Sequence, residues 1–222
     1  MMRAVLFDLD DTLFDHSTAA RSAVARWASE RGLVGEEEQL SSRWRSVSDL
    51  HYRRYQAREI TFEEQGRERV REFLARDFDV AEADEAFDDY RRHYRMDWRA
   101  FPDARPTIER LHADGVVVGV LTNGAREQQA LKIERVGLAD LRMPLFASSD
   151  FPAGKPDPRP FLGACEELGL PPDQVTMVGD SLPIDVEGAL GAGLDAVLLD
   201  RFDAHPGHDG ARIRSLDELS IH

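Results

Sequence analysis

The stretch AVLFDLDDT, residues 4–12, decides the fold class. Its first four residues are apolar and β-prone, and acidic residues end the run abruptly, which is typical of a short buried strand. Asp8, Asp10 and Thr12 follow directly after this predicted strand. Because open parallel sheets bind ligands beyond the carboxyl ends of their strands, these side chains are candidates for a functional site.

Four further apolar runs of the same kind occur along the chain, and helical patterns separate them. The runs are residues 116–121, 145–147, 175–178 and 196–199. The helical patterns are residues 107–113, 127–136, 160–168 and 184–192. Strands that are apolar throughout and alternate with helices predict a parallel sheet covered on both faces. We therefore expect an α/β fold with a doubly wound parallel sheet.

A long interval after the first strand breaks this alternation. Between residues 14 and 98 the sequence has helical patterns only, at residues 17–31, 37–58, 61–75 and 82–95. Thr61 and Glu64 fit a capping box, and Gly32 follows the first helix as a C-terminal cap would. A structureless loop of this length is implausible in a compact domain. We expect an α/β core of residues 1–14 and 98–222 and an inserted α-helical cap domain of residues 15–97.

The overall charge restricts the partners of the protein. A formal net charge of −14 repels nucleic acids and anionic membrane surfaces, so we expect neither as a partner. No apolar run is long enough to span a bilayer, and the first residues lack a signal-peptide pattern. We expect a soluble, cytoplasmic protein whose partner is a small molecule. An anionic ligand would need a locally positive site.

Polar residues also follow the later strands of the predicted sheet. Thr122 and Asn123 come directly after one strand, and Asp180 and Asp185 follow another, with Lys155 between the two motifs. Because the carboxyl ends of parallel strands share one edge of the sheet, these groups are expected to lie near Asp8 and Asp10.

This combination of side chains is suited to phosphoryl transfer. Asp8, Asp10 and Asp180 would repel one another unless a cation lay among them, and Mg²⁺ prefers oxygen ligands. One carboxylate can attack a phosphate and form an acyl phosphate, while a second protonates the leaving alkoxide and later activates water. Thr122 can bind phosphate oxygens, and Lys155 can supply positive charge. The residues therefore predict a Mg²⁺-dependent reaction of a small phosphate ester.

Four motifs in this order resemble those of the haloacid dehalogenase-like (HAD) hydrolase superfamily over essentially the whole chain. They are DLDDT at 8–12, TN at 122–123, KP at 155–156 and GDSLPID at 179–185. The resemblance implies that Asp8 is the nucleophile and that Asp10 is the acid/base, also binding Mg²⁺ through its backbone carbonyl. It implies a metal carboxylate from Asp180, with Asp185 and Thr12 supporting the metal site. Thr122, Asn123 and Lys155 are then expected to bind phosphate.

The helical insertion after the first motif matches the α-helical cap type of this superfamily. The expected function is hydrolysis of small phosphorylated metabolites, of the sugar phosphate, nucleotide or phosphoglycolate type, through an aspartyl phosphate. A sugar phosphomutase related to β-phosphoglucomutase needs the same core residues and stays open. A haloacid dehalogenase is less favoured, since such enzymes usually lack the second aspartate that Asp10 supplies. A binding protein without turnover is also open, although the intact set of charges argues against it.

Overall fold

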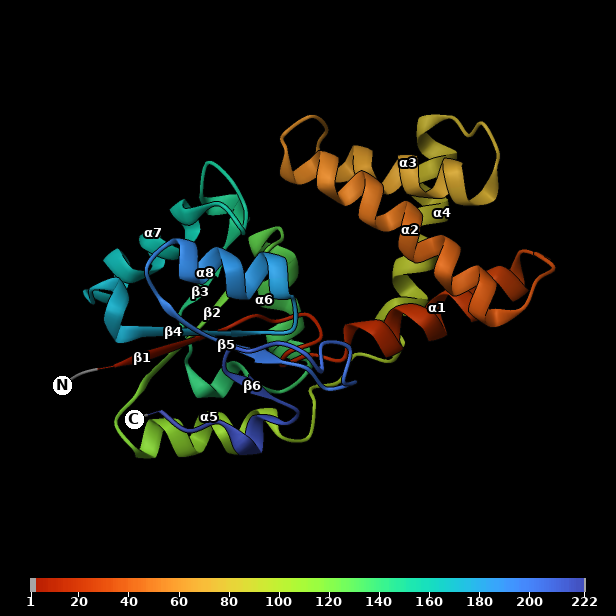
Figure 1. Ribbon diagram of the computed structural model, residues 1–222. Coiled ribbons are helices and arrows are strands. Elements are labelled where there is room, and N and C mark those ends of the chain that lie inside the picture. The colour runs from red at the N-terminus through yellow and green to blue at the C-terminus, as the bar shows by residue number, and fades with distance from the viewer. Residues whose placement is uncertain (1–2, 222) are drawn as a thin grey trace. The chain divides into compact units, whose positions relative to one another are not determined.

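The computed structural model describes residues 3–221 and contains two compact units. One unit is built from the residues up to Asp15 together with those from Arg99 onward, and the other is His16–Trp98 (Figure 1). The first unit contains the sheet, and the second consists of helices.

The sheet has six parallel strands in the described residues. They are β1 (Ala4–Phe7), β2 (Val117–Thr122), β3 (Leu145–Ala147), β4 (Val175–Gly179), β5 (Asp195–Leu199) and β6 (Arg212–Ile213). Their order is β3-β2-β1-β4-β5-β6, and every pairing is parallel. In the central strand, Phe7 pairs with Val120 of β2 and with Val178 of β4. The predicted α/β fold is confirmed. The strand order reverses direction between β1 and β4, which is where such sheets bind ligands.

Helices cover both faces of this sheet. They are α5 (Ala104–Ala113), α6 (Arg126–Arg135), α7 (Pro158–Leu168) and α8 (Glu187–Gly191). Helix α5 lies on one side of the strands, and α7 and α8 lie together on the other (Figure 1). Leu6, Leu121, Phe161 and Met177 are fully buried in one hydrophobic cluster. Burial on both faces explains why β1 is apolar at every position.

The structure differs from the sequence-based expectation in two places. Residues 184–192 do not form a single α-helix, because Leu182–Val186 is a π-helical turn that precedes α8. Strand β6 was not predicted, since two residues with a polar Arg212 give no apolar run. The π-helical turn carries Asp185, and such turns are frequent at functional sites.

The second unit contains four helices in the described residues. They are α1 (His16–Glu30), α2 (Glu37–Gln56), α3 (Phe62–Leu74) and α4 (Val80–Met96). The predicted capping box of Thr61 and Glu64 is present, and Asp79 and Glu82 form a second one at the start of α4. These boxes satisfy backbone N–H groups that would otherwise lack partners at the helix starts. Across the described residues, no helix is both long and apolar enough to cross a membrane.

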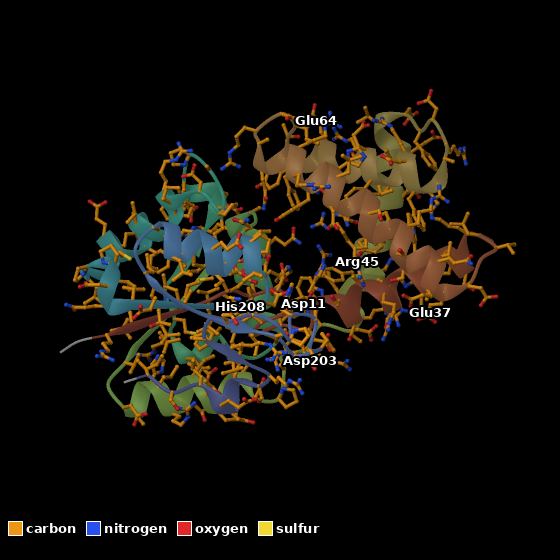
Figure 2. The ribbon with its side chains drawn as sticks, in the orientation of Figure 1. Asp11, Glu37, Arg45, Glu64, Asp203 and His208 are labelled. Atoms are coloured by element: carbon orange, nitrogen blue, oxygen red, sulfur yellow. The ribbon has the colours of Figure 1, made fainter. Side chains whose placement is uncertain are left out.

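Aromatic side chains form the core of this helical unit. The Trp27 ring stacks on Phe73 at 5.5 Å between centroids and meets Trp44 edge-on at 5.3 Å. The ring centroids of Tyr90 and Trp44 lie 4.3 Å apart. Charged side chains such as Glu37, Arg45 and Glu64 are exposed (Figure 2). The unit therefore has a hydrophobic core of its own.

The chain leaves and re-enters the sheet-containing unit at one point. The backbone N–H of Asp15 donates to the carbonyl of Arg99 at 3.1 Å, and that of Phe101 donates to Leu13 at 2.9 Å. The Asp15 carboxylate accepts from the Arg99 guanidinium at 2.8 and 3.0 Å. The two segments that flank the helical insertion are thus fastened to each other.

Candidate active site

Asp8 is the first residue after the central strand. Its backbone N–H donates to the carbonyl of Val178 at 2.9 Å, which extends the pairing of β1 with β4 by one residue. This bond fixes the Asp8 backbone at the carboxyl edge of the sheet, at the point where the strand order reverses.

Lys155 connects Asp8 to Asp185. Its Nζ donates to Asp8 Oδ1 at 2.7 Å, to Asp185 Oδ1 at 2.6 Å and to the Leu121 carbonyl at 2.8 Å. Three acceptors satisfy all three donors of the ammonium group. Burial opposes its charged form, but the carboxylates of Asp185 and Asp8 outweigh this and raise the pKa of Lys155 above its ordinary value. The positively charged form of Lys155 is therefore favoured beside Asp8.

Asn123 holds the segment that carries Lys155. Its Oδ1 accepts from the Lys155 backbone N–H at 2.8 Å, and its Nδ2 donates to the Lys155 carbonyl at 2.9 Å. Gly154 makes this approach possible, since a Cβ there would lie 2.7 Å from Asn123 Oδ1. The Asn123 side chain thus fixes the main chain of Lys155. Its predicted contact with phosphate stays a prediction.

Asp185 reaches the site from the π-helical turn after β4. Its Oδ2 accepts from the backbone N–H of Ser181 at 3.1 Å, while Oδ1 binds Lys155. The carboxylate lies directly against Gly179, where an added Cβ would be 2.3 Å from Oδ2. The absence of a side chain at Gly179 therefore leaves the space that Asp185 occupies.

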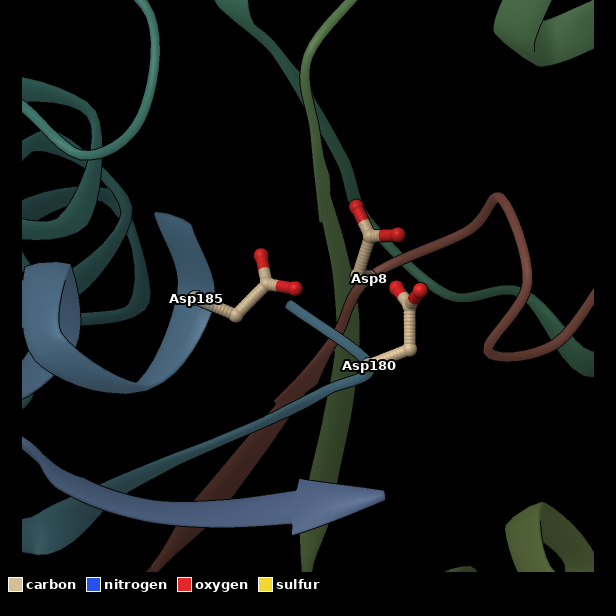
Figure 3. A group of neighbouring side chains, drawn as sticks. All are labelled: Asp8, Asp180 and Asp185. Carbon is tan, nitrogen blue, oxygen red and sulfur yellow. The ribbon is translucent and has the colours of Figure 1, made fainter. Parts of the chain in front are cut away.

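Three carboxylates from different segments meet at this edge. Oxygens of Asp8, Asp180 and Asp185 lie within 4.8 Å of one another, and Figure 3 shows the three side chains together. Burial raises the pKa of Asp8 to about 7 and that of Asp180 to about 9, and neighbouring carboxylates add to both shifts. Grouped carboxylates that resist ionisation are the setting in which a bound cation stabilises the charged forms. The group fits a hard divalent cation such as Mg²⁺.

The carboxylate of Asp10 does not belong to this group of three and is bound by a different lysine. Within the described part of the chain, the group of three contains Asp185 where the sequence suggested Asp10. Lys132 of α6 donates to both oxygens of Asp10, at 2.6 and 2.8 Å. The predicted metal contact of Asp10 uses its backbone carbonyl, so it stays a prediction. The sequence reasoning missed Lys132, although a signal existed, because Lys132 and Lys155 are the two lysines of the chain.

The two predicted threonines have different surroundings. Thr122, at the end of β2, accepts a hydrogen bond on Oγ1 from Gln129 Nε2 at 2.7 Å. Gln129 was also missed, since it lies inside a helix with no motif around it. Thr12 is buried, and its carbonyl accepts from Arg201 at 2.9 Å. Its hydroxyl has no hydrogen-bond partner among residues 3–221. The hydrogen bonds of Thr12 within these residues are therefore made by its backbone.

Comparison with known proteins is consistent with this fold. A family model for haloacid dehalogenase-like hydrolases matches residues 2–193. A glyceraldehyde 3-phosphate phosphatase of Methanopyrus kandleri is 30% identical, covering 90% of this chain and 85% of that protein. The (S)-2-haloacid dehalogenase 4A of Burkholderia cepacia is 29% identical, covering 98% and 93%. The structure of the HAD-hydrolase YfnB from Bacillus subtilis bound to magnesium has a TM-score of 0.84 at 23% identity, covering 98% and 96%. The chain belongs to the haloacid dehalogenase-like hydrolases.

Proposed function

We propose that this protein is a Mg²⁺-dependent phosphatase of small phosphorylated metabolites, with Asp8 as the nucleophile. The observation that carries the proposal is the buried Asp8–Lys155 pair beside the Asp180 carboxylate. A carboxylate held by one fixed ammonium group at a sheet edge is oriented for attack on an electrophile. The phosphatase related to this chain supports a phosphate ester as that electrophile.

The metal is assigned to the carboxylates of Asp8 and Asp180 and to the backbone carbonyl of Asp10. The raised pKa values of Asp8 and Asp180 support this assignment, because both reflect negative charges crowded in a buried place. When bound, Mg²⁺ offsets the charge of the phosphate and of the carboxylates around it. Asp185 binds Lys155 and the Ser181 backbone, so we assign it to the support of the site.

The reaction then has two steps. An oxygen of Asp8 attacks phosphorus, and the P–O bond to the leaving group breaks as Asp10 donates a proton to the departing alkoxide. Asp10 next removes a proton from a water molecule, whose oxygen attacks the aspartyl phosphate and releases inorganic phosphate. Lys155 holds Asp8 in place, and Thr122 and Asn123 are assigned to binding the phosphate.

Dehalogenation is the second candidate, since a haloacid dehalogenase is also similar to this chain. Halide is a leaving group that needs no proton, so that reaction does not need a second carboxylate as a proton donor. The presence of Asp10 beside Asp8 therefore favours phosphatase activity. A phosphomutase would share the first step and differ in transferring the phosphoryl group to a second sugar hydroxyl.

A substrate screen separates these reactions. Purified protein is incubated with sugar phosphates, nucleoside monophosphates and phosphoglycolate, with Mg²⁺ or with a chelator, and released phosphate is measured. Chloride release from (S)-2-chloropropionate and NMR of isomerised sugar phosphates test the other two reactions. We expect Mg²⁺-dependent phosphate release that Asp8→Asn abolishes, because an amide is a poor nucleophile. Phosphate release that persists in Asp8→Asn, or chloride release alone, would contradict the proposal.

A further inference from the structure

The Asp10 carboxylate is bound by a buried lysine of helix α6. Lys132 Nζ donates to Oδ1 at 2.6 Å and to Oδ2 at 2.8 Å, so both carboxylate oxygens are engaged. The Lys132 side chain is 3% exposed, whereas that of Asp10 is 30% exposed. The carboxylate is thus held from the protein side and still reaches solvent on another side.

A second side chain of the same helix supports this arrangement. Gln129 lies three residues before Lys132, on the same face of α6. Its Nε2 donates to Asp10 Oδ2 at 3.3 Å and to Thr122 Oγ1 at 2.7 Å. The amide therefore joins the carboxylate after β1 to the hydroxyl at the end of β2. Gly124 leaves room for it, since a Cβ there would lie 2.9 Å from Gln129 Cδ.

A purely structural ion pair is a poor explanation for Lys132. Burying an ammonium group is costly, and replacing buried ion pairs with apolar side chains of similar size is often neutral or stabilising. Lys132 also lies over the Phe14 ring, with Nζ 5.1 Å from its centroid, so an apolar side chain would fit the same surroundings. Lys132 nevertheless keeps its charge in this buried position and binds Asp10, the carboxylate that the proposed reaction needs for proton transfer. This points to a role of Lys132 that acts through Asp10.

We propose that Lys132, assisted by Gln129, is a positioning residue that fixes the Asp10 carboxylate for proton transfer to the leaving group. Lys132 itself does not touch the substrate in this proposal. The inference rests on the proposed function, in which Asp10 is the acid/base. Without Lys132 the carboxylate can rotate, so the fraction of molecules with the acid correctly placed falls, while Asp8 and its attack on phosphorus are left intact.

The test compares two esters of nearly the same shape, phenyl phosphate and 4-nitrophenyl phosphate. Only the first has a leaving group that depends strongly on protonation. Because kcat/KM covers the steps up to the release of the alcohol, the ratio of the two kcat/KM values reports the acid. A loss of folded or correctly assembled enzyme lowers both values equally and leaves their ratio unchanged. The ratio therefore separates positioning from a structural role.

We expect Lys132→Met to lower kcat/KM for phenyl phosphate by about tenfold or more, and no further than Asp10→Asn, since an acid contributes about 10²–10⁴-fold. The value for 4-nitrophenyl phosphate should change little. Lys132→Arg, which keeps the charge, should recover part of the loss. In the Asp10→Asn background Lys132→Met should add nothing, because the two residues act as one unit. Arg135→Met removes an exposed cation from the same helix and should leave both esters unaffected.

Equal losses on both esters in Lys132→Met, with a normal response in Asp10→Asn, would overturn the positioning role and leave the proposed function standing. If wild-type protein hydrolyses neither ester, or Asp10→Asn leaves the ratio unchanged, the assigned function of Asp10 is wrong and the inference fails with it. Should Lys132→Met not fold, Lys132→Gln replaces it and is judged by the same ratio.

Discussion

The position of Asp185 depends on the absence of a side chain at Gly179. An added Cβ at residue 179 would lie 2.3 Å from Oδ2 and 2.6 Å from Cβ of Asp185, which is 2% exposed and has no room to retreat. Gly179→Ala is therefore expected to displace Asp185 and with it Lys155. We expect a destabilisation of about 1–3 kcal/mol, typical of overpacking, and a loss of phosphatase activity.

The control is Gly191→Ala, because a Cβ at that position meets nothing within 4 Å. Thermal unfolding and phosphate release are measured for both variants. A Gly179→Ala protein as stable and active as Gly191→Ala would mean that Asp185 has more freedom than its contacts indicate.

Asp180 provides a separate test of the metal assignment. Asp180→Asn removes one charge from the group of three carboxylates, so we expect the Mg²⁺ concentration for half-maximal activity to rise by at least about tenfold. The stabilisation of the protein by added Mg²⁺, read as a shift in Tm, should shrink in parallel. Asp209→Asn, a change at an exposed carboxylate of the same unit, is the control. An unaltered Mg²⁺ dependence in active Asp180→Asn would exclude Asp180 as a ligand.

Sequence patterns identify most directly the residues that follow strands. Asp8, Thr122 and Asp180 were predicted because each follows an apolar run, and parallel strands bring their carboxyl ends to one edge. Lys132 and Gln129 were not found, since their approach depends on how α6 packs beside the sheet. The direction of the Asp10 carboxylate also depends on a side-chain torsion angle, which the spacing of residues in the sequence does not determine.

At the scale of elements, Asp103 joins three segments of the sheet-containing unit. It lies just before α5 and accepts from Arg201 after β5, at 2.8 and 2.9 Å. It also accepts from the Ser215 hydroxyl at 2.9 Å and the Leu216 backbone at 3.0 Å. Burial would raise the pKa of Asp103, but the hydrogen bonds from Arg201 and Leu216 outweigh it, and the net shift is downward.

Asp103→Asn is therefore expected to destabilise the protein by about 1–3 kcal/mol at pH 7, because Arg201 loses its negatively charged partner and one of the two acceptor oxygens is removed. A carboxyl with a lowered folded-state pKa stabilises the fold at pH values above its ordinary pKa. That contribution is lost as the pH falls through the folded-state pKa. The difference between the variant and wild type should thus shrink toward pH 3 in urea unfolding. With Asp114→Asn, at the exposed end of α5, we expect little change at either pH.

Element boundaries were predictable where apolar periodicity was strong. The expected strand at residues 175–178 is Val175–Gly179, and the helix expected at residues 61–75 is Phe62–Leu74. The π-helical turn before α8 was not predictable, because the contacts that Asp185 makes from it, to Lys155 and to the Ser181 backbone, are not visible in the sequence. Strand β6 pairs through two residues only, at Leu198–Arg212 and Leu199–Ile213, so its sequence carries too little pattern.

At the scale of the whole molecule, the fastened base of the helical insertion predicts that the sheet-containing unit folds without it. Asp15 and Arg99 are joined by a backbone hydrogen bond and an ion pair, so a short Gly/Ser linker can replace residues 16–98. We expect a protein with one cooperative unfolding transition, since β1 keeps its pairings with β2 and β4. If the helical unit is the cap that selects substrates, the shortened protein should discriminate less among phosphate esters.

Circular dichroism and the ester panel test both parts of this prediction. A shortened protein that does not fold would show that the insertion stabilises the sheet-containing unit. Unaltered rates and selectivity would remove the helical unit from substrate choice.

The burial of Lys132 and Lys155 has a consequence for chemical labelling. These are the two lysines of the chain, and the exposed fractions of the whole residues are 2% for Lys132 and 3% for Lys155. Arginine supplies the basic side chains of the surface, so an amine-selective acylating reagent meets no accessible side-chain amine on the folded protein. The rate at which either lysine is modified, located by peptide mass, would then measure how often this edge of the sheet opens transiently.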